Sequence, residues 1–218
     1  MNEITKRLLT SLFLIILLIL AFFYSYILII LLVLISTISW LEFNGLISRI
    51  FYKKKFKNNF LSFLFKIIVL IYLTTFSFLV FDGIVNFDKV YMFYLFCICI
   101  ASDTGGFIFG KTFKGKKLTK ISPNKTISGS IGSFVLSLSM IPLFYYLKSY
   151  DLFYLIFLTI IVSLTCQIGD LFISYLKRKA KIKDTGDILP GHGGLLDRID
   201  GMLLALPVGI FSTLILQI

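Results

Sequence analysis

The sequence predicts an all-α, polytopic integral membrane protein with about seven transmembrane helices. Hydrophobic residues make up 58% of its 218 residues and the mean hydropathy is +0.95, whereas an ordinary soluble domain is about 45–50% apolar. Charged residues make up only 15%, too few to cover a soluble protein of this size. The aromatic content of 17% excludes a disordered or collagen-like chain. The expected environment is therefore a lipid bilayer.

The apolar segments follow one another along the chain. Segment 8–41 holds no charged residue and is longer than one helix needs to cross a hydrocarbon core of about 30 Å, so we expect two helices with a tight turn near 24–26. A secretory signal peptide is the alternative at the N-terminus. The apolar run is too long for one and lacks a small-residue cleavage site, so the first helix is expected to be retained. Five further spans are expected at 60–81, 90–109, 127–147, 152–176 and 201–218.

The formal net charge of +11 reports the orientation of these helices. Of the 22 Lys and Arg residues, 19 fall in the N-terminal tail and in segments 42–59, 110–126 and 177–200. The positive-inside rule then predicts a cytoplasmic N-terminus and cytoplasmic loops, so a nucleic-acid partner is not required. The Lys, Ile, Phe and Asn bias suggests an AT-rich bacterial genome. We therefore expect a multi-pass protein of the plasma (inner) membrane.

The carboxylates gather at the expected cytoplasmic face. Six of the 11 acidic residues lie in or beside the two longer loops, namely Asp103, Asp170, Asp184, Asp187, Asp197 and Asp200. An ionisable side chain within a membrane helix costs about 2.5 kcal/mol or more unless it faces a partner or a wet cavity. Asp103 and Asp170 therefore mark a candidate site.

Two helix faces at the cytoplasmic ends of the C-terminal spans carry these groups. The first follows the i, i+4, i+7, i+8 pattern of a single helix face and consists of Asp170, Ser174, Lys177 and Arg178. Asp197 and Asp200 are three residues apart and share a face at the start of the last span. Capping of that helix is the alternative role for this pair.

Two polar loops suit a ligand that carries phosphate groups. Segment 183–194 contains four glycines and a proline, so its backbone amides can approach an anion closely. His192 lies there and is either a substrate contact or an ordinary hydrogen-bonding loop residue. Segment 110–129 alternates cations with hydroxyl and amide side chains, which suits a polyphosphate, with helix capping as the alternative. The end of this segment and the residues after it favour close helix packing, because they are small: Ser128, Gly129, Gly132 and Ser133.

One continuous pattern resembles a known family. Residues 174–200 read Ser174-x-Leu176-Lys177-Arg178, then Lys183-Asp184-x-Gly186, then Leu189-Pro190-x-His192-Gly193-Gly194-Leu195-x-Asp197-Arg198-Ile199-Asp200. This pattern resembles the signature of phosphatidate cytidylyltransferases, also called CDP-diacylglycerol synthases, at every defined position. Three shorter stretches are similar to motifs of the same family: Asp103-Thr104-Gly105-Gly106, Ser122-Pro123-Asn124-Lys125-Thr126 and Gly169-Asp170-Leu171. The chain departs from the family pattern at Ile127-Ser128, where the family commonly has Trp-Glu, and at Ile173, where it commonly has Glu, so no acidic role is assigned there.

The resemblance implies that CTP reacts with phosphatidate to give CDP-diacylglycerol and pyrophosphate, a step of phospholipid biosynthesis. It also implies Mg²⁺ on the phosphates and a second cation such as K⁺. The implied catalytic residues are Asp170, Ser174, Lys177, Asp197 and Asp200. The implied substrate-binding residues are Ser122, Asn124, Lys125, Thr126, Arg178, Lys183, His192 and Arg198. The metal ligands would be Asp170 and Asp197, supported by Asp200 and Asp184.

On this interpretation the chain is a single continuous domain. Segment 1–59 forms an N-terminal two-helix hairpin with a basic loop, and segment 60–218 forms the catalytic membrane domain. The expected partners are CTP, phosphatidate and membrane lipid, and the sequence is compatible with a homodimer. One alternative is a CTP-dependent enzyme acting on another lipid, such as a polyprenol kinase or a CDP-archaeol-type synthase. The other is an ion transporter whose intramembrane aspartates line an ion path.

Overall fold

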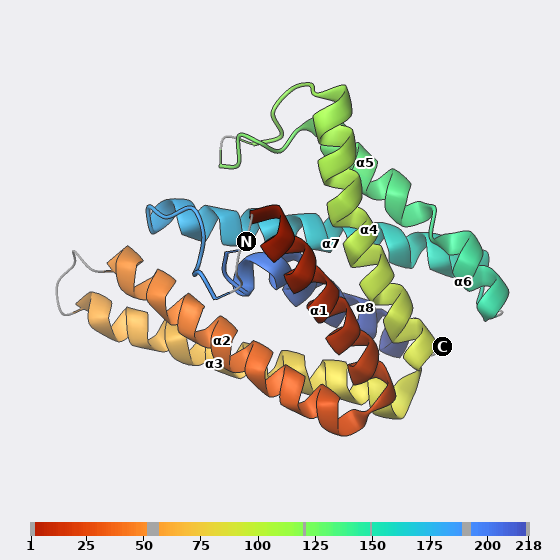
Figure 1. The fold of residues 1–218 in the computed structure, drawn as a ribbon, viewed down its shortest axis with the longest axis horizontal. Helices are drawn as coiled ribbons and strands as arrows, with labels where there is room; N and C mark the ends of the chain where they lie inside the picture. Colours follow the sequence, from red (N-terminus) through yellow and green to blue (C-terminus); the bar gives the residue numbers. More distant parts are fainter. Residues whose placement is uncertain (1–2, 52–56, 120, 149, 189–192, 217–218) are drawn as a thin grey trace. The chain divides into compact units, whose positions relative to one another are not determined.

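The computed structural model describes residues 3–51, 57–119, 121–148, 150–188 and 193–216. They form α1 (Glu3–Phe23), α2 (Ser25–Phe51), α3 (Lys57–Asp82), the π-helical η1 (Gly83–Phe87), α4 (Lys89–Phe113), α5 (Ile127–Leu138), α6 (Ile141–Leu147), α7 (Leu152–Lys179) and α8 (Leu196–Leu216) (Figure 1). Within these residues no extended β-strand forms, and one isolated bridge joins Lys117 to Thr126. The prediction of an all-α protein is confirmed.

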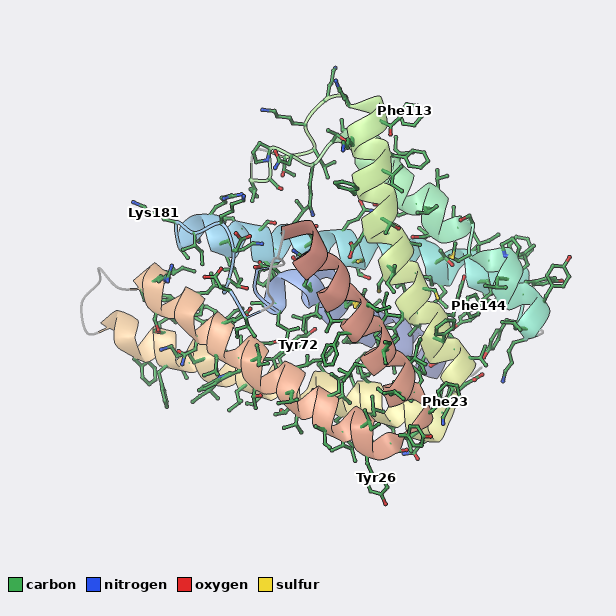
Figure 2. The ribbon with its side chains drawn as sticks, in the orientation of Figure 1. Phe23, Tyr26, Tyr72, Phe113, Phe144 and Lys181 are labelled. Atoms are coloured by element: carbon green, nitrogen blue, oxygen red, sulfur yellow. The ribbon has the colours of Figure 1, made fainter. Side chains whose placement is uncertain are left out.

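Among the described residues, five helical segments are long and apolar enough to cross a membrane: Ser25–Phe51, Phe60–Phe87, Lys89–Phe113, Ile127–Leu147 and Leu152–Lys179. Large apolar side chains are exposed on the helices. Tyr26 is 84% exposed and projects away from the ribbon in Figure 2, and Phe113 is 68% exposed. Apolar surface on this scale suits contact with lipid and not with water. The structure therefore agrees with an integral membrane protein, while the count of seven spans and the cytoplasmic N-terminus stay predictions.

The chain divides into two compact units. The first unit consists of Met1–Phe87 and Leu176–Ile199, and the second of Asp88–Tyr175 and Asp200–Ile218. In the first unit, α1 ends at Phe23 and α2 begins at Ser25, which confirms the turn predicted near 24–26. After this turn α2 and α3 run side by side (Figure 1).

The sequence predicted that a basic loop begins at residue 42. Helix α2 instead continues to Phe51. Glu42 is buried in this helix, and its charge is met by hydrogen bonds, so it does not require a loop. Arg49 lies in the last turn, where a cation complements the helix dipole. At the other end of the chain, α8 begins at Leu196 and not at residue 201.

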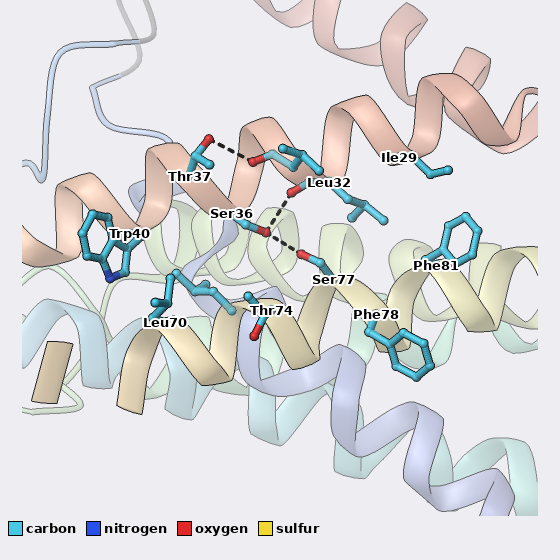
Figure 3. A pocket seen from close by; sticks show the side chains of 12 residues that line it. Ile29, Leu32, Ser36, Thr37, Trp40, Leu70, Thr74, Ser77, Phe78 and Phe81 are labelled. Carbon is cyan, nitrogen blue, oxygen red and sulfur yellow. Dashed lines mark hydrogen bonds between the residues drawn. The ribbon is translucent and has the colours of Figure 1, made fainter. Parts of the chain in front are cut away.

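An apolar pocket of about 390 Å³ lies between α2 and α3 (Figure 3). Its hydroxyl groups already have partners within the two helices. Ser36 Oγ donates to the Leu32 carbonyl at 2.8 Å and is hydrogen-bonded to Ser77, and Thr37 Oγ1 donates to the Val33 carbonyl at 2.9 Å. The pocket therefore suits a hydrocarbon chain, and these hydroxyls are not available to orient a nucleotide.

In the second unit, α4 packs closely on α5 because glycines face each other. A Cβ atom added at Gly132 would lie 2.3 Å from Phe109 Cβ, and one added at Gly105 would lie 2.4 Å from the Gly132 carbonyl oxygen. Ser133 Oγ donates to the Ser102 carbonyl at 2.7 Å. The packing role predicted for the small residues near 128–133 is confirmed.

The span predicted at 127–147 is broken in two. Helix α5 ends at Leu138 and α6 begins at Ile141, with a proline in the first turn of α6. Proline has no backbone N–H to donate and favours the start of a helix over its interior, which explains the break.

Replacing Gly132 with Ala is expected to lower the free energy of unfolding by about 1–3 kcal/mol, because the added methyl group would overlap Phe109 and push α4 and α5 apart. Gly45→Ala is the matched control, since a Cβ atom there meets nothing within 4 Å and Ala is favoured over Gly in a helix. Unfolding of both variants in detergent measures the difference. Equal stability of the two variants would contradict the close packing of α4 on α5.

A polar cluster joins the start of α4 to the segment before α7. Asp88 caps α4 by accepting from the Val90 N–H at 2.8 Å, and it also accepts from the Tyr150 hydroxyl at 2.9 Å. Lys148 Nζ lies 2.8 Å from the same carboxylate. Burial raises the pKa of Asp88, but the hydrogen bonds from Lys148 and Tyr150 outweigh burial and hold this pKa below its ordinary value. Lys148, one of the few cations outside the predicted cytoplasmic segments, thus has a structural partner.

Candidate active site

Lys177 and Asp197 form the centre of a polar cluster in the first unit. Lys177 Nζ lies 2.7 Å from Asp197 Oδ1, and the two side chains are only 13% and 6% exposed. Asp197 Oδ2 accepts from the Thr185 N–H at 2.8 Å, from the Thr185 hydroxyl at 3.1 Å and from the Gly194 N–H at 3.3 Å. Burial raises the pKa of Asp197, but the hydrogen bonds from Lys177 and Thr185 outweigh burial and hold this pKa below its ordinary value. Both oxygens of Asp197 are therefore held by protein donors.

Two residues with a positive φ lie in the segment between α7 and α8 that reaches this cluster. After α7, Lys181 adopts a left-handed conformation with φ of 58°, and Ile182 N–H donates to the Lys177 carbonyl at 3.0 Å. A left-handed residue at this point ends a helix and reverses the chain. Gly193, shortly before α8 begins, has a positive φ of 83°, a conformation that favours glycine. Both sides of the loop reach Asp197.

Glu42 belongs to the same cluster, although the sequence pattern placed it in a loop and gave it no role. Its carboxylate accepts from the Leu195 and Leu196 N–H groups, both at 2.9 Å. The Thr185 hydroxyl also lies 2.6 Å from Glu42 Oε2. The only signal in the sequence is an acidic residue directly after a long uncharged segment, which equally marks the end of a membrane span.

Several amides of the glycine-rich segment are taken by the protein's own carboxylates. The sequence predicted that these amides approach a bound anion. Within that segment, the N–H groups of Thr185 and Gly194 point to Asp197 instead, and just beyond it those of Leu195 and Leu196 point to Glu42. These four amides are not available to a substrate phosphate, so cationic side chains are left as the better candidates for that role.

A second cluster lies in the second unit, where Asp170 is held by Lys125 and Ser174. Lys125 Nζ forms an ion pair with Asp170 Oδ2, and the two side chains are 26% and 31% exposed. Ser174 Oγ donates to Asp170 Oδ1 at 3.3 Å, as expected for i, i+4 neighbours on one helix face. The structure therefore brings together a lysine of the predicted phosphate loop and the aspartate predicted on α7.

Backbone hydrogen bonds shape the loop that carries Lys125. Leu118 N–H donates to the Lys125 carbonyl at 2.8 Å, and Lys125 N–H donates to the Ser122 carbonyl at 3.1 Å. Thr126 caps α5, because its hydroxyl oxygen accepts from the Gly129 N–H at 3.1 Å. The capping role considered for this loop is thus confirmed at Thr126, and the neighbouring Asn124 is exposed.

Glycines allow α7 and α8 to approach each other in the second unit. A Cβ atom at Gly169 would lie 2.6 Å from the Asp200 carbonyl oxygen, and one at Gly201 would lie 2.5 Å from Cys166 Sγ. Asp200 is buried, and its Oδ1 accepts from the Gly201 N–H at 2.8 Å. Asp170 follows Gly169 in the sequence, so it stands beside the helix contact that includes Asp200.

The other predicted residues lie on the surface or outside the described part of the chain. Four of them are exposed, namely Arg178, Lys183, Asp184 and Arg198. Asp103 is exposed on α4 and accepts a hydrogen bond from the Cys166 thiol at 3.6 Å. His192 lies outside the described residues.

The two clusters differ in their fitness to hold a metal ion. Among the residues that the structure describes, no group of three or more His, Cys, Asp and Glu side chains is placed to bind one. Carboxylate oxygens are the ligands that Mg²⁺ prefers. Both carboxylates already have protein donors, but the Asp170 side chain is 31% exposed and that of Asp197 only 6%, so Asp170 fits the role of a ligand better.

Comparisons with known proteins reveal similarity along the chain. A family model described as the cytidylyltransferase family matches residues 1–216. A phosphatidate cytidylyltransferase from Rickettsia typhi is 48% identical over 129 residues, which cover 55% of this chain and 56% of that protein. Proteins of the same name from Staphylococcus haemolyticus and Bacillus subtilis are 44% identical over 121 residues (54% and 46% of the two chains) and 39% identical over 128 residues (56% and 48%). The chain spans about half the length of the curated relatives it matches.

Proposed function

Because the chain belongs to the cytidylyltransferase family, we propose that it transfers the cytidylyl group of CTP to phosphatidate, giving CDP-diacylglycerol and pyrophosphate. The observation that carries this proposal is the Lys177–Asp197 pair at the centre of the family signature. The names of the bacterial relatives support the same substrates. The apolar helices support a reaction at a membrane, where the acyl chains of phosphatidate stay in lipid.

The reaction is an in-line displacement at phosphorus. A phosphate oxygen of phosphatidate forms a bond to the α-phosphorus of CTP, the bond from that phosphorus to the bridging oxygen of the β-phosphate breaks, and pyrophosphate leaves with the electron pair. Such a step is catalysed mainly by positioning and by stabilisation of charge on the phosphate oxygens. The attacking oxygen is already ionised, so no general base is needed.

The cations of the two clusters are suited to stabilise the charge on the phosphate oxygens. We assign Lys177 to stabilisation of the triphosphate, with Asp197 holding its ammonium group in place. Lys125 is assigned to a phosphate group as well. Its ion pair with Asp170 is partly exposed, so breaking it to bind a phosphate costs little free energy. The exposed cations Arg178, Lys183 and Arg198 supply further positive charge. The roles of Ser122, Asn124 and His192 as substrate contacts stay proposals on the strength of the sequence.

A divalent cation, which we propose to be Mg²⁺, would neutralise charge on the triphosphate. Asp170 is our first candidate for a ligand, since its carboxylate is partly exposed and Asp200 lies on the helix packed beside it. Asp197 and Asp184 are the further candidates, with Asp197 more deeply buried than Asp170. A second cation such as K⁺ is proposed from the family resemblance alone.

We further propose that the site faces the cytoplasm of a bacterial cell from the plasma membrane. The distribution of Lys and Arg among the segments supports this orientation, and the relatives are bacterial. CTP is a cytoplasmic nucleotide, which agrees with it.

The purified protein in liposomes that contain phosphatidate is expected to transfer label from α-labelled CTP into lipid when Mg²⁺ is present. γ-Labelled CTP is the matched control, because its label leaves with pyrophosphate in a cytidylyltransferase and enters the lipid in a kinase. Label from the γ position in the lipid, or no label from the α position, would overturn the proposal. Liposomes with a polyprenol in place of phosphatidate test the other lipid substrate directly.

A further inference from the structure

We infer that Glu42, on the N-terminal hairpin, is a positioning residue that holds the start of α8 and the signature loop so that Lys177 and Asp197 keep their arrangement. The signature loop is defined here by its described residues, 183–188 and 193–196. Glu42 lies on α2 of the same compact unit and is 6% exposed. The effect of Glu42 on the reaction rests on the proposed function, whereas its effect on the loop does not.

Glu42 caps α8 from a distant part of the sequence. The first N–H groups of a helix have no partner within the helix, and a nearby carboxylate satisfies them and complements the positive end of the helix dipole. Such a cap usually comes from the residue just before the helix, but here that residue is Leu195, which has no side-chain acceptor. Glu42 instead accepts from the Leu195 and Leu196 N–H groups, both at 2.9 Å.

Two glycines of the family signature make room for this carboxylate. A Cβ atom at Gly186 would lie 2.9 Å from Glu42 Oε1, and one at Gly194 would overlap the Thr185 hydroxyl and lie 2.6 Å from Glu42 Oε2. Gly193 has a positive φ, whereas Gly186 and Gly194 do not, so backbone conformation does not explain glycine at these two positions. The close approach of Glu42 explains it at Gly186, and that of Glu42 together with its partner Thr185 explains it at Gly194.

Thr185 connects Glu42 to the candidate catalytic pair. Its hydroxyl lies 2.6 Å from Glu42 Oε2 and 3.1 Å from Asp197 Oδ2, and its N–H donates to the same Asp197 oxygen. Displacement of Glu42 therefore moves Thr185, and with it the donors that hold Asp197 beside Lys177. A displacement of about 1 Å in such a group lowers turnover by about 10²-fold when it misaligns the reacting atoms.

The first test compares Glu42→Gln with Asp82→Asn, a carboxylate-to-amide change in the same unit, where Asp82 accepts from the Asn86 side chain at 2.8 Å. Glu42→Gln keeps the shape but turns an NH₂ group toward a backbone N–H. We expect hydrogen exchange of a peptide covering residues 193–199 to quicken at least about tenfold in Glu42→Gln and to stay unchanged in Asp82→Asn. Unchanged exchange in Glu42→Gln overturns the inference.

The kinetic arm separates positioning from a merely structural role. In Glu42→Gln, kcat for CDP-diacylglycerol formation is expected to fall about 10–100-fold with KM for phosphatidate within about twofold. Faster exchange with unchanged kcat overturns the positioning role. A wild-type protein without activity overturns the proposed function instead, and the exchange experiment still decides what Glu42 does to the loop.

A double-mutant cycle tests the contact without relying on Glu42→Gln being well folded. Gly186→Ala is expected to lower thermal stability in the parent protein and to have little effect in a Glu42→Ala background, because the clash that it creates is with Glu42. The effects of the two changes are therefore expected to be non-additive. Additive effects would contradict the contact, and so overturn the inference.

Discussion

Replacing Asp197 with Asn is expected to lower kcat for CDP-diacylglycerol formation by at least about 10²-fold. Asn keeps one acceptor oxygen, and its NH₂ group must then face either Lys177 or the Thr185 N–H, both of which donate. The Lys177 ammonium loses its anionic partner and its fixed position. Initial rates in liposomes with α-labelled CTP measure the loss.

Asp187→Asn is the matched control for this change, because Asp187 lies in the same loop and is exposed. Its rate is expected to stay within about twofold of the parent protein. A folded Asp197→Asn protein with parental activity would remove Asp197 from the mechanism.

The thermal stability of Asp197→Asn is a second test of the ion pair with Lys177. Removing one partner of a buried ion pair costs about 3–5 kcal/mol, because the other charge stays buried without compensation. Lys177 is only 13% exposed, so Asp197→Asn is expected to unfold at a lower temperature than the parent protein. Adding Lys177→Met to this variant should recover part of the loss, since it removes the unpaired charge.

The pH dependence of this difference has a definite sign. The pKa of Asp197 is lowered in the folded protein, so its carboxylate stabilises the fold above the ordinary aspartate pKa of about 3.9. That stabilisation is lost as the pH falls through the lower folded-state pKa. The difference in unfolding temperature between the parent protein and Asp197→Asn is therefore expected to be steady near neutral pH and to shrink below about pH 4.

Local patterns in the sequence predicted the parts of this protein that depend on near neighbours. The helix face that begins at Asp170 depends only on helical spacing, and Ser174 indeed donates to Asp170. The turn near Tyr24 follows from the length of an uncharged segment, and the glycines at 129 and 132 from the small residues that close helix packing requires. Such features are fixed within a few residues, which a single sequence records.

Contacts between distant segments were not predictable in the same way. Glu42 stands 153 residues before Leu195, whose N–H it accepts, and nothing in either stretch indicates the other. The ion pair between Lys125 and Asp170 similarly joins a loop to a helix, although each residue was singled out by itself. Two amides of the predicted anion-binding segment, those of Thr185 and Gly194, instead donate to Asp197, and a carboxylate at that distance in the sequence is not visible in the local pattern.

Replacing Lys125 with Met is expected to lower kcat/KM for CTP by about 10²-fold while changing the free energy of unfolding by less than about 1 kcal/mol. Its ion pair with Asp170 is partly exposed, with side chains 26% and 31% exposed, and such pairs contribute little to stability. The lost charge is therefore expected to affect the substrate and not the fold. Lys116→Met, an exposed lysine of the same loop, is the control.

The Mg²⁺ dependence of the rate distinguishes the role of Asp170 from that of Lys125. If Asp170 is a metal ligand, Asp170→Asn raises the Mg²⁺ concentration needed for half-maximal rate by about tenfold or more, whereas Lys125→Met leaves it near the parental value. The two variants differ in this way because a carboxylate binds a cation, whereas an ammonium group binds phosphate. An equal shift in both variants would mean that the ion pair acts as one positioning element, and an unchanged Mg²⁺ requirement in Asp170→Asn would exclude Asp170 as a ligand.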